Sequence, residues 1–121
     1  MGMARTVAAV VGAVYLVVGL AGFVLDIPLF GLFEVNALHN IVHIVIGAIL
    51  LYGATSIPAA VMANRGIGAV LVLLGIIGIP FPDGFDLVPL GGNDIWLHLA
   101  TGAILLAAGS LGEGEPETRS V

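Results

Sequence analysis

Three histidines are the residues of this chain with the clearest capacity for chemistry. His39 and His43 lie four residues apart in the segment NALHNIVHIVIGAILL (36–51), and His98 begins the segment HLATGAILLAAG (98–109). Two imidazoles at positions i and i+4 share one face of a helix, which lets both bind one ion. His98 could add a third nitrogen, and Glu34 or Asp94 a carboxylate. This donor set suits zinc, copper or non-haem iron.

Two other interpretations use the same histidines. His43 and His98 could be opposed axial ligands of a b-type haem inside a helix bundle. They could instead belong to a structural hydrogen-bond network with Asn36, Asn40 and Thr101, which would tie the second apolar segment to the fourth. Because polar side chains inside a membrane often act as packing contacts, the sequence favours this structural or interaction role, with metal or haem binding as the alternative.

Transport and catalysis are further alternatives. Histidines and acids inside a membrane often line ion paths, so an oligomer could translocate ions or protons. A histidine beside Glu34 or Asp94 could also assist metal-dependent hydrolysis. No serine or cysteine lies near these acids to act as a nucleophile, so the sequence leans away from an enzyme.

The composition places these residues in a membrane protein. Of the 121 residues, 60% are hydrophobic and 9% are charged, whereas soluble domains carry about 25% charged residues. The net charge of −5 gives no basic surface for nucleic acid. The chain has no cysteine and no lysine, which excludes a disulfide, a thiolate ligand and a lysine Schiff base. The expected environment is the lipid bilayer, with a second copy or another membrane protein as a possible partner.

Four apolar stretches predict an all-α, multi-pass four-helix bundle. They cover about 7–25, 37–54, 66–79 and 95–111, and the third can be extended backwards through IPAAVMAN. About 20 helical residues cross a hydrocarbon core of about 30 Å. The stretches are long and lack period-2 alternation, which favours helices over strands. Residues 1–111 are expected to form the membrane domain, and the acidic tail at 112–121 is expected to be disordered.

An internal repeat relates the two halves. HIVIGAILLYGA (43–54) aligns with HLATGAILLAAG (98–109) at an offset of 55, and VYLVVGLAGF (14–23) aligns with VLVLLGIIGI (70–79) at an offset of 56. The pattern predicts a duplicated two-helix hairpin, with repeat units at about 7–54 and 66–111. Since each unit crosses the membrane twice, the halves would be parallel repeats.

The arginines predict the orientation. Arg5, Arg65 and Arg119 fall on one side of four spans, whereas the other two connections contain no arginine. The positive-inside rule then places both termini in the cytoplasm of a plasma-membrane protein. Spans two and four begin at the outer face, so the histidines and their polar neighbours would form a His/Asn/acid cluster in the outer leaflet.

The segment NALHNIVHIVIG (36–47) carries a family resemblance. Asn36, then His39-Asn40-x-x-His43, then Gly47 resembles the signature of an uncharacterised family of small four-helix membrane proteins from bacteria and archaea, known only as a domain of unknown function. The resemblance extends to about residue 111. It implies a multi-pass membrane protein and supplies no activity.

Overall fold

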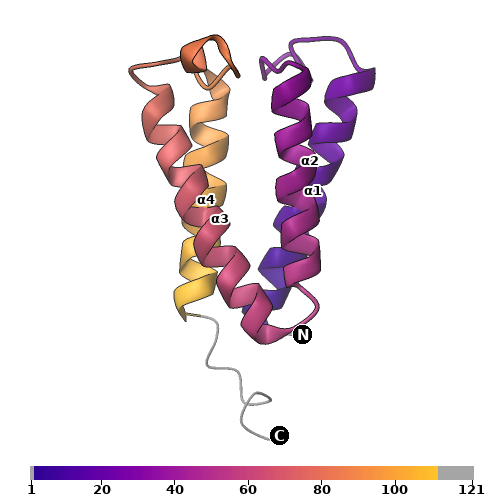
Figure 1. The fold of residues 1–121 in the computed structure, drawn as a ribbon, viewed down its shortest axis with the longest axis vertical. Coiled ribbons are helices and arrows are strands. Elements are labelled where there is room, and N and C mark those ends of the chain that lie inside the picture. The colour runs from indigo at the N-terminus through magenta and orange to yellow at the C-terminus, as the bar shows by residue number, and fades with distance from the viewer. Residues whose placement is uncertain (1, 112–121) are drawn as a thin grey trace, which may run out of the picture.

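The described part of the chain is all-helical, as the apolar stretches predict. The structure is a computed structural model that describes residues 2–111, and the tail at 112–121 that was expected to be disordered lies outside them. In the described part, a short 3₁₀ turn at Gly84–Asp86 precedes the last helix, and an isolated bridge joins two residues of the first loop. The helices are α1 (Met3–Val24), α2 (Ala37–Gly53), α3 (Ile57–Gly78) and α4 (Asn93–Leu111) (Figure 1).

Helices α1, α3 and α4 are each long and apolar enough to cross a membrane. Helix α2 has 17 residues and spans about 26 Å at 1.5 Å per residue. The third helix begins well before residue 66, so the backward extension through IPAAVMAN is correct. Its start is fixed by Ser56, whose side chain accepts a hydrogen bond from the Ala59 backbone, and by Pro58 in the first turn.

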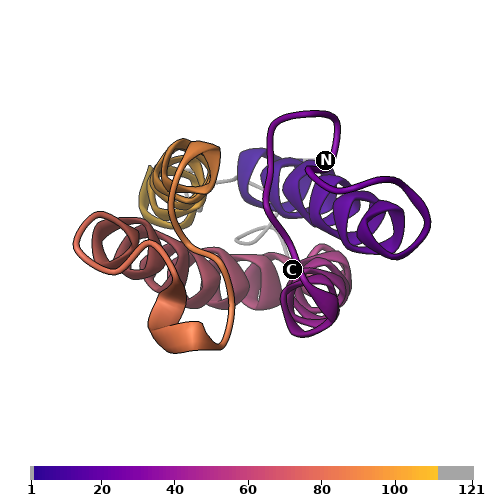
Figure 2. The same ribbon diagram turned by 90° about the horizontal axis from the view of Figure 1, so that it is seen from above.

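The helices form two hairpins, α1 with α2 and α3 with α4. The hairpins lie closest together near the connection between α2 and α3 and splay apart toward the opposite end (Figure 1). That splayed end carries the connections at 25–36 and 79–92, and we call it the loop end. Seen along the bundle, α2 and α4 lie diagonally opposite each other (Figure 2). A side chain that joins α2 to α4 must therefore cross the centre of the bundle.

Glycines allow backbone contact within each hairpin. A Cβ atom on Gly12 would lie 3.0 Å from the carbonyl oxygen of Gly47, and one on Gly47 would lie 2.7 Å from that of Gly12. In the other hairpin, Gly68 and Gly102 face each other in the same way, with both corresponding distances at 2.9 Å. Each hairpin is therefore packed through its own pair of glycines. The two pairs are related by the repeat offsets of 56, from Gly12 to Gly68, and 55, from Gly47 to Gly102. Small residues permit this approach, which maximises van der Waals contact between membrane helices.

Side chains join the hairpins at the loop end. The Asn36 side chain donates to the Leu87 carbonyl at 3.0 Å, and the Asn93 side chain donates to the Leu32 carbonyl at 2.9 Å. Each loop is therefore held to the other hairpin through one asparagine. These two bonds lie at the same end of the bundle as the histidines.

Arginines bond to helix C-termini at the opposite end. The Nε atom of Arg5 donates to the Ala54 carbonyl, and that of Arg65 donates to the Gly109 carbonyl, both at 2.8 Å. Arg65 lies inside α3 rather than in a connection, because that helix begins at Ile57. Both guanidinium groups lie against the carbonyl ends of the paired helices, where positive charge is favourable.

Candidate metal centre

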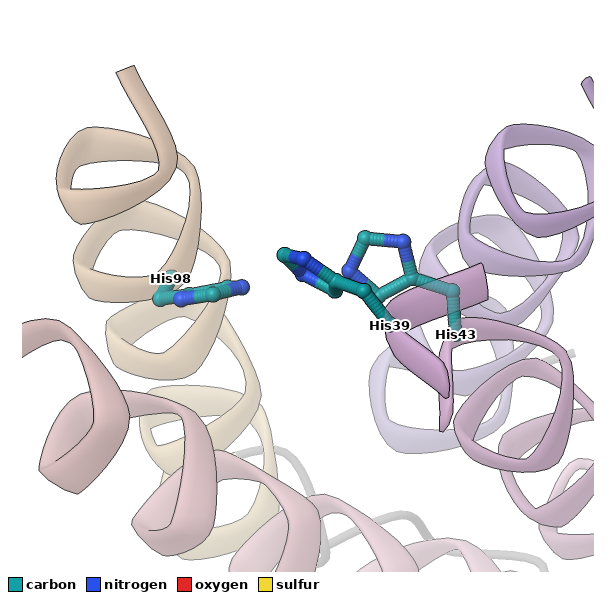
Figure 3. A group of neighbouring side chains, drawn as sticks. All are labelled: His39, His43 and His98. Carbon is teal, nitrogen blue, oxygen red and sulfur yellow. The ribbon is translucent and has the colours of Figure 1, made fainter. Parts of the chain in front are cut away.

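Three histidine rings meet at the loop end of the bundle. His39 and His43 extend from α2, and His98 extends from α4 toward them (Figure 3). One nitrogen from each ring can be chosen so that all three lie within 4.8 Å of one another. The ring centroids of His39 and His43 are 4.3 Å apart, and that of His98 lies 6.1 and 6.2 Å from these two. The i and i+4 spacing thus places two rings together, and the diagonal arrangement adds the third.

The three rings are buried and lack hydrogen-bond partners. Each histidine is at most 3% exposed. Within residues 2–111, both ring nitrogens of His43 and the Nδ1 atoms of His39 and His98 have no hydrogen-bond partner. Buried polar atoms are rarely left unpaired, and each such atom calls for a specific explanation such as an ion. A hydrogen-bonded seam between the rings would have satisfied these nitrogens, so the geometry does not favour that interpretation.

The cavity beside the rings is small. Its volume is about 30 Å³, and all three histidines line it together with apolar side chains of α2, α3 and the 79–92 loop. A cavity of about 10–15 Å³ by this measure holds one water, whereas small-molecule sites enclose about 300 Å³ or more. The space thus has room for a metal ion with one or two small ligands. It does not fit a porphyrin, so the haem alternative with His43 and His98 as axial ligands is disfavoured.

The nitrogens of the three imidazoles lie farther apart than in an occupied zinc or copper site. Two nitrogens bound to one zinc ion at about 2 Å lie about 3.3 Å apart. The nitrogens of the cluster lie within 4.8 Å of one another, so the longest separation has to shorten by about 1.5 Å for all three to bind one ion.

Tyr15 supports the cluster from α1. Its ring packs edge-on against His43, with centroids 5.3 Å apart. Its hydroxyl lies 2.7 Å from the Thr101 hydroxyl, which in turn donates to the Leu97 carbonyl at 2.6 Å. Because the Thr101 proton points to Leu97, Tyr15 is the donor and Thr101 the acceptor. Thr101 therefore takes part in a polar network, but with Tyr15 rather than with a histidine.

The two carboxylates assigned to the metal site occupy different positions. Glu34 is exposed in the first loop, whereas Asp94 is 1% exposed in the first turn of α4. The two carboxylates are close enough for their negative charges to repel each other. The set of converging ligand atoms in the described chain consists of the three histidines and includes neither acid.

The two asparagines of the motif serve the backbone and the helix packing. Asn36 is exposed and caps α2, where its side chain accepts a hydrogen bond from the His39 backbone at 2.8 Å. Asn40 is buried and packs against Gly22 of α1, where a Cβ atom would collide with its amide. Both residues thus fix the start of α2 and its distance from α1, which sets the position of His39 and His43.

Sequence reasoning misses two buried polar residues of the framework. Tyr15 lies on the face of Gly12 and Gly19, a position that could have indicated burial against the second hairpin. Asn64 has no exposed surface and donates to the Ala4 carbonyl at 3.0 Å. Asn64 could have been recognised as a buried polar residue because it stands in the apolar segment IPAAVMAN at the start of the third helix.

The chain matches over residues 5–111 a family whose description is a domain of unknown function, DUF4383. The protein belongs to this family. The match covers almost the whole of the four helices and all three histidines, so the candidate metal centre lies within the DUF4383 domain. Neither the curated proteins nor the solved structures contain a match to the chain.

Proposed function

We propose that this DUF4383 protein is a multi-pass membrane protein that binds one first-row transition-metal ion through His39, His43 and His98. The observation that carries the proposal is the convergence of three buried imidazoles whose nitrogens lack hydrogen-bond partners among residues 2–111. Nitrogen donors alone favour zinc or copper, with non-haem iron as a third possibility. Three protein ligands leave one position of a tetrahedral ion open, where the ion can act as a Lewis acid.

The membrane topology is part of the same proposal. All four helices cross the plasma membrane, both termini lie in the cytoplasm, and the metal centre lies in the outer leaflet. The length and apolarity of α1, α3 and α4 support this arrangement. Large apolar side chains on every helix are exposed and would contact lipid, a second copy or another membrane protein. Arg5 and Arg65, at the end opposite the histidines, satisfy the positive-inside rule.

We further propose that residues 1–111 are one domain made of two duplicated hairpins, with units at about 7–54 and 66–111. The matched glycine contacts support this origin. A Cβ atom added to Gly19 would lie 2.8 Å from the Asn40 carbonyl oxygen, and one added to Gly75 would lie 3.3 Å from that of Ile95. His43 and His98 are then equivalent residues of the two units. At the same offset of 55, His39 corresponds to Asp94, so only the unit with the signature from Asn36 to Gly47 carries a second imidazole.

Ion translocation through one protomer receives less support. Buried apolar side chains of the second, third and fourth helices follow the histidines toward the arginine end, namely Ile46, Leu50, Leu71 and Leu105. This layer separates the cluster from the proposed cytoplasmic side. An ion bound to the histidines would be closed off from that side, which fits binding better than passage.

Metal titration of the detergent-purified protein tests the proposal. After removal of bound metal with a chelator, Zn²⁺ or Co²⁺ should bind once per chain and raise the unfolding temperature. Binding to the folded state alone adds about 2.7 kcal/mol of stability at an ion concentration about 100 times the Kd. The variant His43→Ala should lose this increase, while Tyr52→Phe, at an exposed position, should keep it. An equal increase in wild type and His43→Ala would overturn the proposal.

A further inference from the structure

Asp94 is a buried carboxylate without a hydrogen-bond partner. It is 1% exposed, and neither of its carboxylate oxygens has a partner among the described residues. Burying such a group without compensation is costly. The described arginines, Arg5 and Arg65, bond to carbonyls at the opposite end of the bundle. A different cation near the loop end would explain why a carboxylate is kept in this position.

His98 is the polar residue that Asp94 can reach along its own helix. The two residues are at positions i and i+4 of α4, where side chains are neighbours with Cβ atoms about 6 Å apart. Helical side chains tilt toward the N-terminus, so the turn that contains Asp94 is the part of α4 within reach of the His98 side chain. The Nδ1 atom of His98 is also buried without a hydrogen-bond partner in residues 2–111. A donor and an acceptor that both lack partners thus lie one turn apart.

We infer that Asp94 is the positioning residue of the metal centre, which accepts a hydrogen bond from Nδ1–H of His98 and offsets the charge of a divalent cation. This inference rests on the proposed function. A metal-binding histidine usually donates its second ring N–H to a carboxylate or carbonyl, which fixes the tautomer and the ring orientation. With its proton held on Nδ1, His98 presents the lone pair of Nε2 toward His39 and His43. Asp94 acts through His98 and is not itself a ligand.

The test compares Asp94→Asn with Asp83→Asn, a matched change at an exposed carboxylate of the 79–92 loop. Co²⁺ is the probe, because its visible absorption reports the ligand set as well as the affinity. Loss of an outer carboxylate typically weakens metal binding by about 10–100-fold. We therefore expect D94N to bind Co²⁺ more weakly by this factor, to reach the wild-type absorption at saturation, and to retain one ion per chain. D83N should match the wild type.

The metal-free proteins supply a second measurement. Without the ion no cation offsets the charge of the Asp94 carboxylate, and a neutral amide is cheaper to bury than an uncompensated charge. Metal-free D94N should thus unfold at the wild-type temperature or above it, while its metal affinity falls. If Asp94 had a purely structural role, metal-free D94N would unfold at a lower temperature than metal-free wild type. That result, or a D94N variant that does not fold, would contradict the inference.

The outcomes separate this inference from the proposed function. If wild type binds no Co²⁺, the metal proposal itself fails. If wild type binds Co²⁺ and D94N binds it equally tightly, only the role of Asp94 is refuted. If saturated D94N shows an altered absorption, Asp94 is a ligand rather than a positioning residue, and the inference is also overturned.

Discussion

His43 and His98 place their ring centroids 6.2 Å apart although they belong to helices that lie diagonally across the bundle. Each comes from the second helix of a hairpin, and each hairpin is packed through its own glycines. The imidazoles therefore join two hairpins that splay apart at this end (Figure 1). An ion held between the rings would bridge the hairpins where the helices themselves are most separated.

The glycine contact within each hairpin predicts a sharp loss of stability on adding one methyl group. In Gly47→Ala the new Cβ would lie 2.6 Å from the Leu16 backbone nitrogen, so the helices must move apart. We expect a loss of about 1–3 kcal/mol in the free energy of unfolding, as for other overpacked sites. Gly102→Ala should behave alike, since its Cβ would lie 2.8 Å from the Val72 nitrogen. Chemical unfolding in detergent, followed by circular dichroism, measures both.

Gly66→Ala is the matched control for this prediction. Gly66 lies in a helix, and a Cβ atom there would meet nothing within 4 Å. Because alanine favours a helix by up to about 1 kcal/mol over glycine, this variant should be as stable as wild type or more stable. Equal stability of the Gly47, Gly102 and Gly66 variants would refute the close backbone packing.

The Tyr15–Thr101 hydrogen bond predicts coupling between the first and last helices. Tyr15→Phe and Thr101→Val should each destabilise the protein by about 0.6–2 kcal/mol, because polar contacts between membrane helices are worth about this much. In the double variant the losses should be less than additive, since either change alone breaks the 2.7 Å bond. Strictly additive losses in thermal unfolding would show that the two hydroxyls do not interact.

Single cysteines test the membrane topology, since the natural chain contains none. Asp83→Cys and Thr55→Cys are exposed at opposite ends of the bundle. In intact cells, a membrane-impermeant maleimide should label the Asp83 variant at once and the Thr55 variant only after permeabilisation. The reverse pattern would place the histidines near the cytoplasm, and labelling of both from outside would rule out four spans.

Much of the fold could be predicted from the sequence because helix formation in an apolar segment depends on local composition. The stretches at 7–25, 37–54 and 95–111 correspond closely to α1, α2 and α4. The third helix is harder to place, because Asn64 and Arg65 interrupt its hydrophobic pattern. Both are accommodated by carbonyl groups of another helix, Asn64 by that of Ala4 and Arg65 by that of Gly109, and such long-range partners cannot be read from one segment.

The sequence predicts that the three histidines lie together, as the structure has them, but it does not predict the surroundings of the cluster. Helical spacing places His39 and His43 on one face, and the repeat pairs His43 with His98. The sequence could not show that Asn40 turns toward Gly22, because that depends on how closely α1 and α2 pack. Nor could it show how small the cavity beside the rings is, which depends on the apolar side chains that α3 and the 79–92 loop bring to it.

Elemental analysis of the protein as isolated from cells is the most direct test of the metal centre. The protein would be purified in detergent without chelators and without a polyhistidine tag, beside His43→Ala/His98→Ala and a control, Tyr52→Phe, at an exposed position. We predict close to one zinc, copper or iron per chain in wild type and in the control, and almost none in the double variant. Absence of metal from the wild type, or an equal amount in the double variant, would contradict a metal ion bound by His39, His43 and His98.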